Sequence, residues 1–506
     1  MNIFHVWEYM ERWAKEDPQK TAVIDQSGAI SYAELVSAYQ SVASGLAQRI
    51  EQGSPIAVCM DKGIPALCSF FGIASAGGFY VMLSPDLPSA RLAQIQSVLK
   101  APYVITDAEH ASLALQLFAP QQVLLFEDLR RTPADSSLLA AVREAALDTD
   151  PLYATFTSGS TGVPKGVVAS HRSVIDFIEH FSEIFGFSRD DRFANQAPFD
   201  FDLSVKDIYT SMKIGATLVI TPKALFSRPV ELLDWLCAQE VTVMIWAVSA
   251  LCLISTFHGL DYKTPKTVRK ILFSGEVMPV KHLNSWRSHL PEAMFVNLYG
   301  PTEITCNCTY HILSPERSYE DGIPIGRHFP NEQILLLDAE NKLITAAGTE
   351  GEICVRGTAL ALGYLDAPEQ TAAAFVQDPR NTRYPDLIYR TGDLGRYDET
   401  GDLLFCGRRD HQVKYMGHRI ELQEVEHGIA GVDGVERCCC IFDEEKQKLY
   451  GFYQGTIDRN TLLEALGRIF PVFMIPGVLE TVEEFPLTKN GKIDRRALLE
   501  RRKKRR

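Results

Sequence analysis

Short apolar runs alternate along the chain with longer segments whose apolar residues recur every three or four positions. Residues 55–60 (PIAVCM), 80–84 (YVMLS) and 103–107 (YVITD) are typical of short buried strands, whereas the pattern of residues 30–50 predicts a helix. The same strand pattern recurs at residues 123–127, 216–221, 241–247 and 270–275. Such alternation predicts a layered α/β body with mostly parallel strands. No period of 20–50 residues repeats, which argues against a solenoid.

One apolar stretch is long enough to raise the question of a membrane span. Residues 63–83 contain no charged side chain, but Pro65, Gly77 and Gly78 interrupt them. We therefore expect a buried helix, a Gly-Gly turn and a strand here rather than a membrane helix. Residues 1–18 lack the basic and apolar regions of a signal peptide, so we expect a cytoplasmic protein.

The pattern changes near residue 405, where residues 407–421 begin a compact run of strands and helices that continues to the end. We therefore predict an N-terminal core of residues 1–408 and a small α+β domain of residues 409–506. Apolar residues make up 46% of the 506 positions and charged residues 23%, as in ordinary globular proteins.

The charge balance is acidic, with 51 basic and 64 acidic residues and a net charge of −13. An acidic body argues against nucleic-acid binding, because contacts to phosphates need a basic surface. Residues 495–506 carry eight basic side chains and one acid, and we expect them to form a solvated, frayed terminus. The eleven cysteines have no paired zinc spacing, which indicates free thiols in a reducing compartment.

A glycine-rich loop at residues 155–167 (TFTSGSTGVPKGV) has the composition of a phosphate site. Its glycines allow successive backbone N–H groups to turn toward an anion, and Lys165 adds a positive charge. It is not a Walker A loop, because Pro164 stands where that motif places its second glycine. The loop suits a polyphosphate.

Four more motifs follow in order: NLYGPTE (297–303), YRTGDL (389–394), GRRDHQVKYMGHRIE (407–421) and LTKNGKIDR (487–495). With the glycine-rich loop they resemble the adenylate-forming superfamily, which includes nonribosomal peptide synthetase adenylation domains, acyl-CoA ligases and luciferases. The resemblance covers nearly the whole chain. It implies an ATP-dependent ligase in which a carboxylate attacks the α-phosphate of ATP, pyrophosphate leaves, and a thiol then displaces AMP from the acyl-adenylate.

The resemblance also implies which residues hold the nucleotide. The β- and γ-phosphates would be bound by Thr157, Ser158, Gly159, Ser160, Thr161, Gly162 and Lys165. The adenosine would be bound by Asn297, Tyr299, Gly300, Thr302, Asp393 and Arg408. Tyr299 would stack on adenine, and Asp393 would accept both ribose hydroxyls, since a carboxylate can take two donors. Glu303 resembles the magnesium ligand, and its hard oxygens suit Mg²⁺.

Three further roles come from the resemblance alone. Lys492 would be the catalytic lysine that stabilises the charge developing between the carboxylate and the α-phosphate. The small domain would be mobile and rotate about a hinge at Asp410 between the two half-reactions. Gly417 would leave room for a pantetheine arm.

The stretch FDFDLSVKDIY (199–209) resembles one wall of the acid-binding pocket. Asp202 matches the aspartate that pairs with the amino group of an amino-acid substrate. Other pocket positions are Leu203, Lys206, Ile245, Trp246, Leu272, Ser274, Leu298, Cys306 and Asn307. Lys206 departs from the apolar residue that many relatives have. Either it points outward into solvent, or it points inward, where it contacts a second polar group of the substrate or neutralises Asp202. Neutralisation would suit an amino-substituted aryl acid.

The thiol that accepts the acyl group has several alternatives. No carrier-protein segment follows NGKIDR and no condensation domain precedes the motifs, so we expect a stand-alone enzyme that loads a separate phosphopantetheinylated carrier protein in nonribosomal peptide synthesis. The stretches FDLSV and SGEVMP are similar to D-alanine–carrier protein ligases, a second possibility. A CoA ligase is a third. A non-catalytic nucleotide-binding scaffold is disfavoured by Lys165, Glu303, Asp393 and Lys492 together. We expect no nucleic-acid or membrane partner.

Overall fold

The computed structural model describes residues 3–159, 162–409, 412–444, 446–486 and 493–504. It divides into two compact units. The first comprises Met1–Pro85, Leu99–Thr155 and Gly166–Arg409, and the second Asp86–Val98, Phe156–Lys165 and Asp410–Arg506. The predicted division into residues 1–408 and 409–506 stays a prediction.

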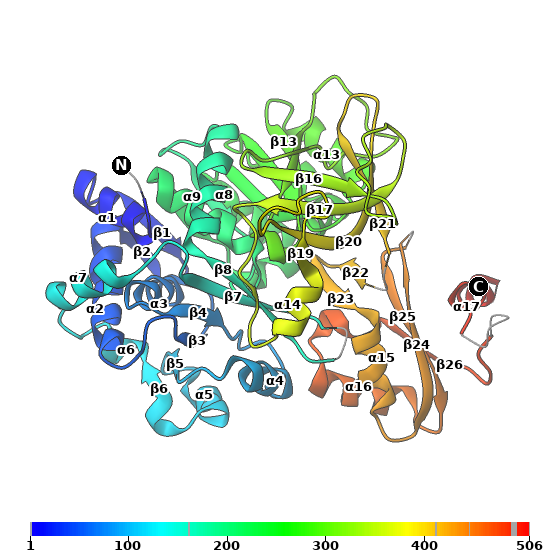
Figure 1. The fold of residues 1–506 in the computed structure, drawn as a ribbon, viewed down its shortest axis with the longest axis horizontal. Helices are drawn as coiled ribbons and strands as arrows, with labels where there is room; N and C mark the ends of the chain where they lie inside the picture. The colour runs from blue at the N-terminus through cyan, green and yellow to red at the C-terminus, as the bar shows by residue number, and fades with distance from the viewer. Residues whose placement is uncertain (1–2, 160–161, 410–411, 445, 487–492, 505–506) are drawn as a thin grey trace. The chain divides into compact units, whose positions relative to one another are not determined.

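A nine-stranded sheet in the first unit has the order β15-β14-β13-β12-β11-β9-β10-β1-β2. Figure 1 labels its strands β1, β2 and β13. Its strands are β1 Thr21–Asp25, β2 Gly28–Ser31, β9 Arg192–Asn195, β10 Thr217–Ile220, β11 Val243–Ala247, β12 Lys270–Ser274, β13 Met294–Tyr299, β14 Thr309–Ile312 and β15 Arg327–His328. The central pairs are parallel, whereas β2, β14 and β15 at the edges pair antiparallel.

A seven-stranded sheet has the order β18-β8-β7-β4-β3-β5-β6. Its strands are β3 Pro55–Cys59, β4 Phe79–Met82, β5 Tyr103–Thr106, β6 Val123–Leu125, β7 Pro151–Thr157, β8 Lys165–Ser170 and β18 Gly363–Tyr364. The strands predicted at residues 55–60, 80–84 and 103–107 are therefore confirmed. The apolar stretch 63–83 forms helix α3, a Gly-Gly turn and β4, also as expected.

Helices surround both sheets, because each sheet has buried apolar residues on its two faces. They are α1 Trp7–Glu16, α2 Tyr32–Ala47, α3 Ile64–Ser75, α5 Ala111–Leu117, α6 Phe126–Leu129, α7 Ser136–Ala145, α8 His171–Ile184, α9 Leu203–Ile214, α10 Pro229–Ala238, α11 Val248–Thr256, α12 Gly259–Tyr262, α13 Val280–His289 and α14 Pro368–Ala374. Among the described residues, no helix combines the length and apolar character that crossing a bilayer needs. All eleven cysteines are free thiols, as expected.

A five-stranded antiparallel sheet completes the first unit. It consists of β16 Glu332–Leu337, β17 Gly351–Gly357, β19 Phe375–Gln377, β20 Leu387–Tyr397 and β21 Leu403–Arg408. Strands β20 and β21 bring Asp393 and Arg408 into direct register.

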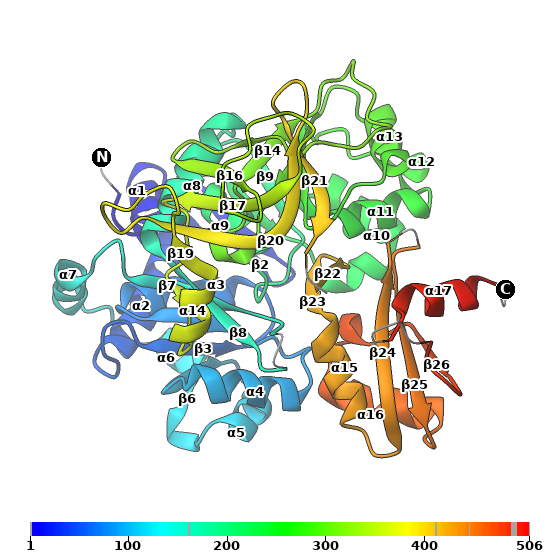
Figure 2. The ribbon, with the colours of Figure 1, turned by 45° about the vertical axis from the view of Figure 1, so that its right-hand side comes forward.

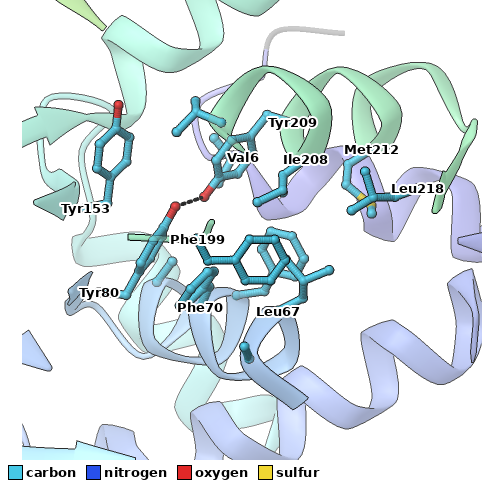
Figure 3. Packing of buried hydrophobic residues seen from close by; sticks show 14 of the residues in the cluster. Val6, Leu67, Phe70, Tyr80, Tyr153, Phe199, Ile208, Tyr209, Met212 and Leu218 are labelled. Carbon is cyan, nitrogen blue, oxygen red and sulfur yellow. Dashed lines mark hydrogen bonds between the residues drawn. The ribbon is translucent and has the colours of Figure 1, made fainter. Parts of the chain in front are cut away.

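Helix α9 is buried along almost its whole length. Ile208, Tyr209 and Met212 belong to the same core cluster as Phe70 on α3, and the Tyr80 and Tyr209 hydroxyls hydrogen-bond at 2.9 Å (Figure 3). Such packing fixes the helix against rotation about its axis, and therefore fixes where its polar side chains point.

The end of α9 is closed by Gly215, which adopts the left-handed conformation with φ 71°. The indole ring of Trp13 covers this glycine so closely that a Cβ would lie 2.5 Å from the ring. Trp13 Nε1 also donates to the carbonyl oxygen of Lys213 at 3.0 Å. Glycine is required here both for its conformation and for the approach of the ring.

The second unit contains the hairpin β22 Gln412–Tyr415 and β23 His418–Glu421, and a three-stranded sheet of β24 Val435–Asp443, β25 Lys448–Gly455 and β26 Val478–Thr481. Its helices are α4 Ser89–Leu99, α15 Leu422–Ala430, α16 Arg459–Ile469 and α17 Arg495–Lys504. Helices α15 and α16 cover one face of the sheet and α17 the other (Figure 2).

The expectation of a frayed, solvated C-terminus is wrong for the described part of residues 495–506. Helix α17 packs Leu498 against the sheet in the cluster that contains Ile441 and Phe452. Arg495 pairs with Glu426 at 2.5 Å. The apolar side chain within the basic run supplies the anchor that charge counting overlooks.

The candidate active site

Lys206 points into the protein. It lies in the first turns of α9, its side chain is fully buried, and its Nζ donates to Asn307 Oδ1 at 2.7 Å and to Ser274 Oγ at 3.1 Å. Of the two orientations that the sequence left open, the structure has the inward one, and the solvated alternative is wrong.

Asp202 and Cys306 join the same group. Asp202 is the N-cap residue of α9 and is 4% exposed, and Cys306 Sγ donates to its carbonyl oxygen at 3.1 Å. Burial raises the pKa of the Cys306 thiol well above its usual value, and the nearby Asp202 raises it further. The thiol therefore stays protonated and keeps its role as a donor. Five predicted pocket residues, counting Ser274 and Asn307, thus form one connected set.

The loop that carries Cys306 and Asn307 is held by a close backbone approach. Thr305 and Cys306 both have positive φ values, of 52° and 80°. A Cβ at Gly300 would lie 2.4 Å from Asn307 Cα, so only glycine allows the two segments to meet. Gly300, predicted to flank the adenine, therefore also fixes the loop of the predicted acid pocket.

The apolar pocket positions divide between two faces of the nine-stranded sheet. Ile245, Leu272 and Leu298 belong to the core cluster that contains Cys306. Trp246 lies on the opposite face, where it packs in another cluster with Phe273. Because side chains alternate along a strand, the neighbours Ile245 and Trp246 cannot face the same pocket.

Two other predicted positions have local partners. Trp246 Nε1 donates to the carbonyl oxygen of Ala194 at 2.8 Å, which satisfies the buried indole. Leu203 packs with Ala197 and Ala247 at the start of α9. The structure does not bring Trp246 together with Lys206.

A second buried polar group beside the pocket was not found from the sequence. Asn195 Nδ2 donates to Asp207 Oδ2 at 3.0 Å, and Lys62 Nζ donates to the carbonyl oxygen of Gln196 at 3.0 Å. Burial raises the pKa of Asp207 to about 8. Burial therefore favours the protonated form of Asp207. One indication of this group was present in the sequence, because Asp207 directly follows Lys206.

The residues predicted to bind adenosine meet at the end of β13. Tyr299 Oη donates to Asp393 Oδ2 at 2.5 Å, and the Arg408 guanidinium pairs with the other oxygen of Asp393. Arg408 Nη2 also donates to the carbonyl oxygen of Thr391 at 3.1 Å. Burial, followed by the charge of Asp393, raises the pKa of Tyr299 well above its usual value, so the phenol stays a donor.

Asn297 and Thr302 flank this group. Asn297 Nδ2 donates to the carbonyl oxygen of Pro324 at 2.8 Å, which orients its amide. Thr302 begins the short 3-10 helix η3, Thr302–Ile304, which places Glu303 in a fully buried position.

Glu303 is held by Tyr364, whose hydroxyl donates to Glu303 Oε1 at 2.8 Å. Sequence reasoning missed Tyr364, because it lies 61 positions away and in no recognised motif. Among the described residues, no group of three or more His, Cys, Asp or Glu side chains could hold a metal ion alone. A single carboxylate still fits Mg²⁺, which keeps several waters and takes phosphate oxygens from a nucleotide.

The glycine-rich loop belongs to the second unit. Ser158 Oγ donates to the carbonyl oxygen of Arg419 at 2.7 Å, and Gly159 N donates to Glu424 Oε2 at 3.2 Å. A Cβ at Gly159 would lie 2.0 Å from the carbonyl oxygen of Val163, so the turn requires glycine. The amide of Gly159 thus donates to an anionic oxygen.

The remaining loop positions frame that turn. Thr157 ends β7, Gly162 has a φ of 80°, and Lys165 begins β8. Gly417 is the second residue of the hairpin turn between β22 and β23, with a φ of 82°. Ser160, Thr161, Asp410 and Lys492 lie outside the described residues.

Comparison with known proteins identifies the family. The model of the AMP-binding enzyme family matches residues 10–365. The chain is an AMP-binding enzyme. This AMP-binding enzyme is 31% identical to zwittermicin A synthase ZmaJ of Bacillus cereus, over 97% of this chain and 94% of ZmaJ. It is also 32% identical to tyrocidine synthase 3 of Brevibacillus parabrevis over 97% of its own length, but spans only 8% of that synthase.

Solved structures agree with this membership. The structure of holo-PA1221, described as a nonribosomal peptide synthetase protein containing adenylation and PCP domains, matches with a TM-score of 0.85 and 27% identity. That match covers 98% of this chain and 84% of PA1221. The α/β fold and the adenylate-forming ligase family predicted from the sequence are confirmed.

Proposed function

We propose that this AMP-binding enzyme adenylates an amino acid with ATP and passes the acyl group to the phosphopantetheine thiol of a separate carrier protein. One observation carries the proposal. Ser274 and Tyr299 are the last residues of the neighbouring parallel strands β12 and β13, so a polar acid-pocket residue and a nucleotide residue share one sheet edge. Open α/β sheets bind ligands at the carboxyl ends of their strands.

The first half-reaction requires positioning and charge neutralisation more than covalent help. Tyr299 would stack on adenine while Asp393 accepts the ribose hydroxyls, and the paired Arg408 holds the Asp393 carboxylate in place for that role. Lys492 would stabilise the charge that develops as the carboxylate oxygen attacks the α-phosphorus and pyrophosphate leaves. Glu303 would hold Mg²⁺, which neutralises the phosphate oxygens when it is bound.

The amino group of the substrate would pair with Asp202. A carboxylate that is 4% exposed needs a cation or several donors to offset its lost hydration. Lys206 donates to Ser274 and Asn307, and the family resemblance assigns Asp202 to the amine of the substrate. We therefore expect an amino acid, whose ammonium pairs with a carboxylate more strongly than the weakly basic amine of an aminobenzoate.

Two of the alternative activities are less well supported. A D-alanine ligase would place a methyl group beside the buried Lys206, which would leave the ammonium next to an apolar surface. For the acceptor, the structural relative PA1221 combines adenylation with a PCP domain, which supports a carrier-protein thiol over CoA.

ATP–pyrophosphate exchange with a panel of proteinogenic amino acids and aminobenzoates tests the first half-reaction. We expect exchange with at least one amino acid and none with aminobenzoates. Exchange with only aminobenzoates or acids without an amine would overturn the role of Asp202. Exchange restricted to small apolar amino acids such as alanine would overturn the polar pocket.

The acceptor needs a separate measurement. The enzyme with ATP and its preferred acid is offered a holo-carrier protein in one reaction and CoA in another. We expect acylation of the carrier protein, followed by mass spectrometry, to be faster by at least an order of magnitude. Comparable turnover of CoA would contradict the proposal.

A further inference from the structure

Lys206 is a fully buried amine, and its hydrogen bonds to Ser274 and Asn307 go to neutral side chains. Its Nζ bonds to the side-chain oxygens of Ser274 and Asn307. A buried charge normally has a counter-ion, because two neutral hydrogen bonds do not replace the hydration that it loses. The anion that would pair with Lys206 is a group of the substrate, and this inference rests on the proposed function.

Two acids near Lys206 have other partners in the proposed complex. Asp202 would pair with the substrate ammonium, as proposed above. Asp207 accepts a hydrogen bond from Asn195 at 3.0 Å, and burial favours its protonated form. A charged Lys206 would therefore need an anionic group of the substrate.

An anion would also favour the charged form of the lysine. Burial lowers the pKa of Lys206, whereas the nearby acids raise it. A carboxylate bound beside Nζ acts in the same direction as those acids, because an opposite charge within a few ångströms stabilises the ammonium.

We propose that the acid substrate is an amino dicarboxylic acid whose side-chain carboxylate binds to Lys206, Ser274 and Asn307. The ammonium of such a substrate meets Asp202, its reacting carboxylate faces the nucleotide, and its second carboxylate meets Lys206. Each charge of the pocket then has an opposite charge in the ligand.

The helix places both charged side chains on one face. Asp202 and Lys206 are four residues apart at the start of α9, so their Cβ atoms are about 6 Å apart. One small substrate that carries both an ammonium and a second carboxylate, as aspartate and glutamate do, can therefore contact both side chains.

The two partners of Lys206 also have donors for a carboxylate. A serine hydroxyl that accepts from Lys206 retains its own proton to donate, and the Asn307 amide retains its NH₂ group. A carboxylate in this position would thus receive one charge-assisted hydrogen bond and neutral ones beside it.

The test is ATP–pyrophosphate exchange by the wild-type enzyme with L-glutamate, L-aspartate, L-glutamine, L-asparagine and L-leucine. We expect kcat/KM for one of the two dicarboxylates to exceed that of its amide by about tenfold to a hundredfold, the worth of a hydrogen bond to a charged group. A wild-type preference for an amide or for leucine overturns the inference while leaving the proposed function intact. Exchange with no acid at all overturns both.

The variant Lys206→Met removes the ammonium and keeps the apolar stem. We expect the preference for the dicarboxylate over its amide to disappear, with KM for ATP unchanged. The matched control is Lys213→Met at the other end of the same helix, where Lys213 bonds to Ser182 at 2.7 Å, and it should retain the wild-type preference.

Thermal unfolding of both variants shows whether they fold. If Lys206→Met does not fold, Ser274→Ala takes its place, and a drop of about fivefold or more in the same preference is expected. Unchanged discrimination in a folded Lys206→Met protein overturns the inference.

Discussion

The phenol of Tyr299 donates a 2.5 Å hydrogen bond to Asp393, a residue 94 positions later in the chain. The ring predicted to stack on adenine and the carboxylate predicted to accept the ribose hydroxyls are therefore fixed to one another before any nucleotide binds. Because Arg408 holds the second oxygen of Asp393, the carboxylate cannot rotate freely. Such preorganisation reduces the entropy that nucleotide binding must overcome.

This relationship predicts different effects for two substitutions at residue 299. Tyr299→Phe keeps the ring but removes the hydrogen bond, so KM for ATP should rise about threefold to tenfold, the worth of one hydrogen bond. Tyr299→Ala removes the stacking surface as well, and its KM should rise by a further factor of about ten. Exchange kinetics at varied ATP provide both values. Equal values for the two variants would contradict the stacking role.

Lys492 is predicted to act on the transition state rather than on nucleotide binding. Lys492→Ala should lower the rate of adenylate formation by about two orders of magnitude or more, while the Kd for ATP changes little. Exchange assays and calorimetric titration with ATP separate the two effects. The control Lys448→Ala replaces an exposed lysine at the start of β25 and should behave as wild type. An unaffected exchange rate in Lys492→Ala would refute the role.

His171 should make the stability of the protein depend on pH. Its ring is 2% exposed, accepts from Val6 N at 3.4 Å and packs edge-on against Trp7. Burial lowers the pKa of His171 from 6.5 to about 3, and the nearby His5 lowers it further. The unfolded chain therefore binds a proton at His171 that the folded chain does not bind. The free energy of unfolding consequently falls as the pH drops from 6.5 toward 3.

Urea denaturation between pH 7 and pH 5 measures this effect. At pH 5, His171 should lower the free energy of unfolding of the wild type by about 2 kcal/mol, since each pKa unit corresponds to about 1.4 kcal/mol. His171→Gln, which does not titrate, should lose correspondingly less over the same interval, even if its stability at pH 7 is lower. Parallel pH profiles for the two proteins would show that this histidine does not contribute.

Two glycines in the left-handed conformation allow the cost of backbone strain to be measured separately from the cost of displacing a ring. Gly215 lies under Trp13, whereas Gly186, with a φ of 57°, has nothing within 4 Å of an added Cβ. Gly186→Ala should cost only the conformational penalty of about 1 kcal/mol. Gly215→Ala should cost about 2–4 kcal/mol, because it also displaces the indole ring. Similar unfolding free energies for the two variants would mean that the ring moves aside without cost.

Sequence patterns located the elements well where apolar runs were bounded by clear turns. The run at residues 123–127 was only partly correct, since β6 ends at Leu125 and Phe126 begins α6. The orientation of Lys206 could not be predicted, because its partners Ser274 and Asn307 lie 68 and 101 positions away and meet it only in the fold.

Family resemblance assigns pocket residues less precisely than the geometry of a strand does. It assigned both Ile245 and Trp246 to the acid pocket, although adjacent residues of a strand face opposite sides of the sheet. The structure places Ile245 with Cys306 in one core and Trp246 with Phe273 in another. Similarly, counting the basic residues of 495–506 gave no hint that Leu498 would anchor them.

The contact of Trp13 with the end of α9 has a practical consequence for pocket exchange between AMP-binding enzymes. Arg12 and Trp13 both donate to the carbonyl oxygen of Lys213, at 2.6 and 3.0 Å. The segment proposed to select the acid is thus clamped from the far end by residues about 200 positions earlier. If residues 199–215 were transplanted into another AMP-binding enzyme, they would lack these two hydrogen bonds from α1. The transplant should therefore include α1 as well.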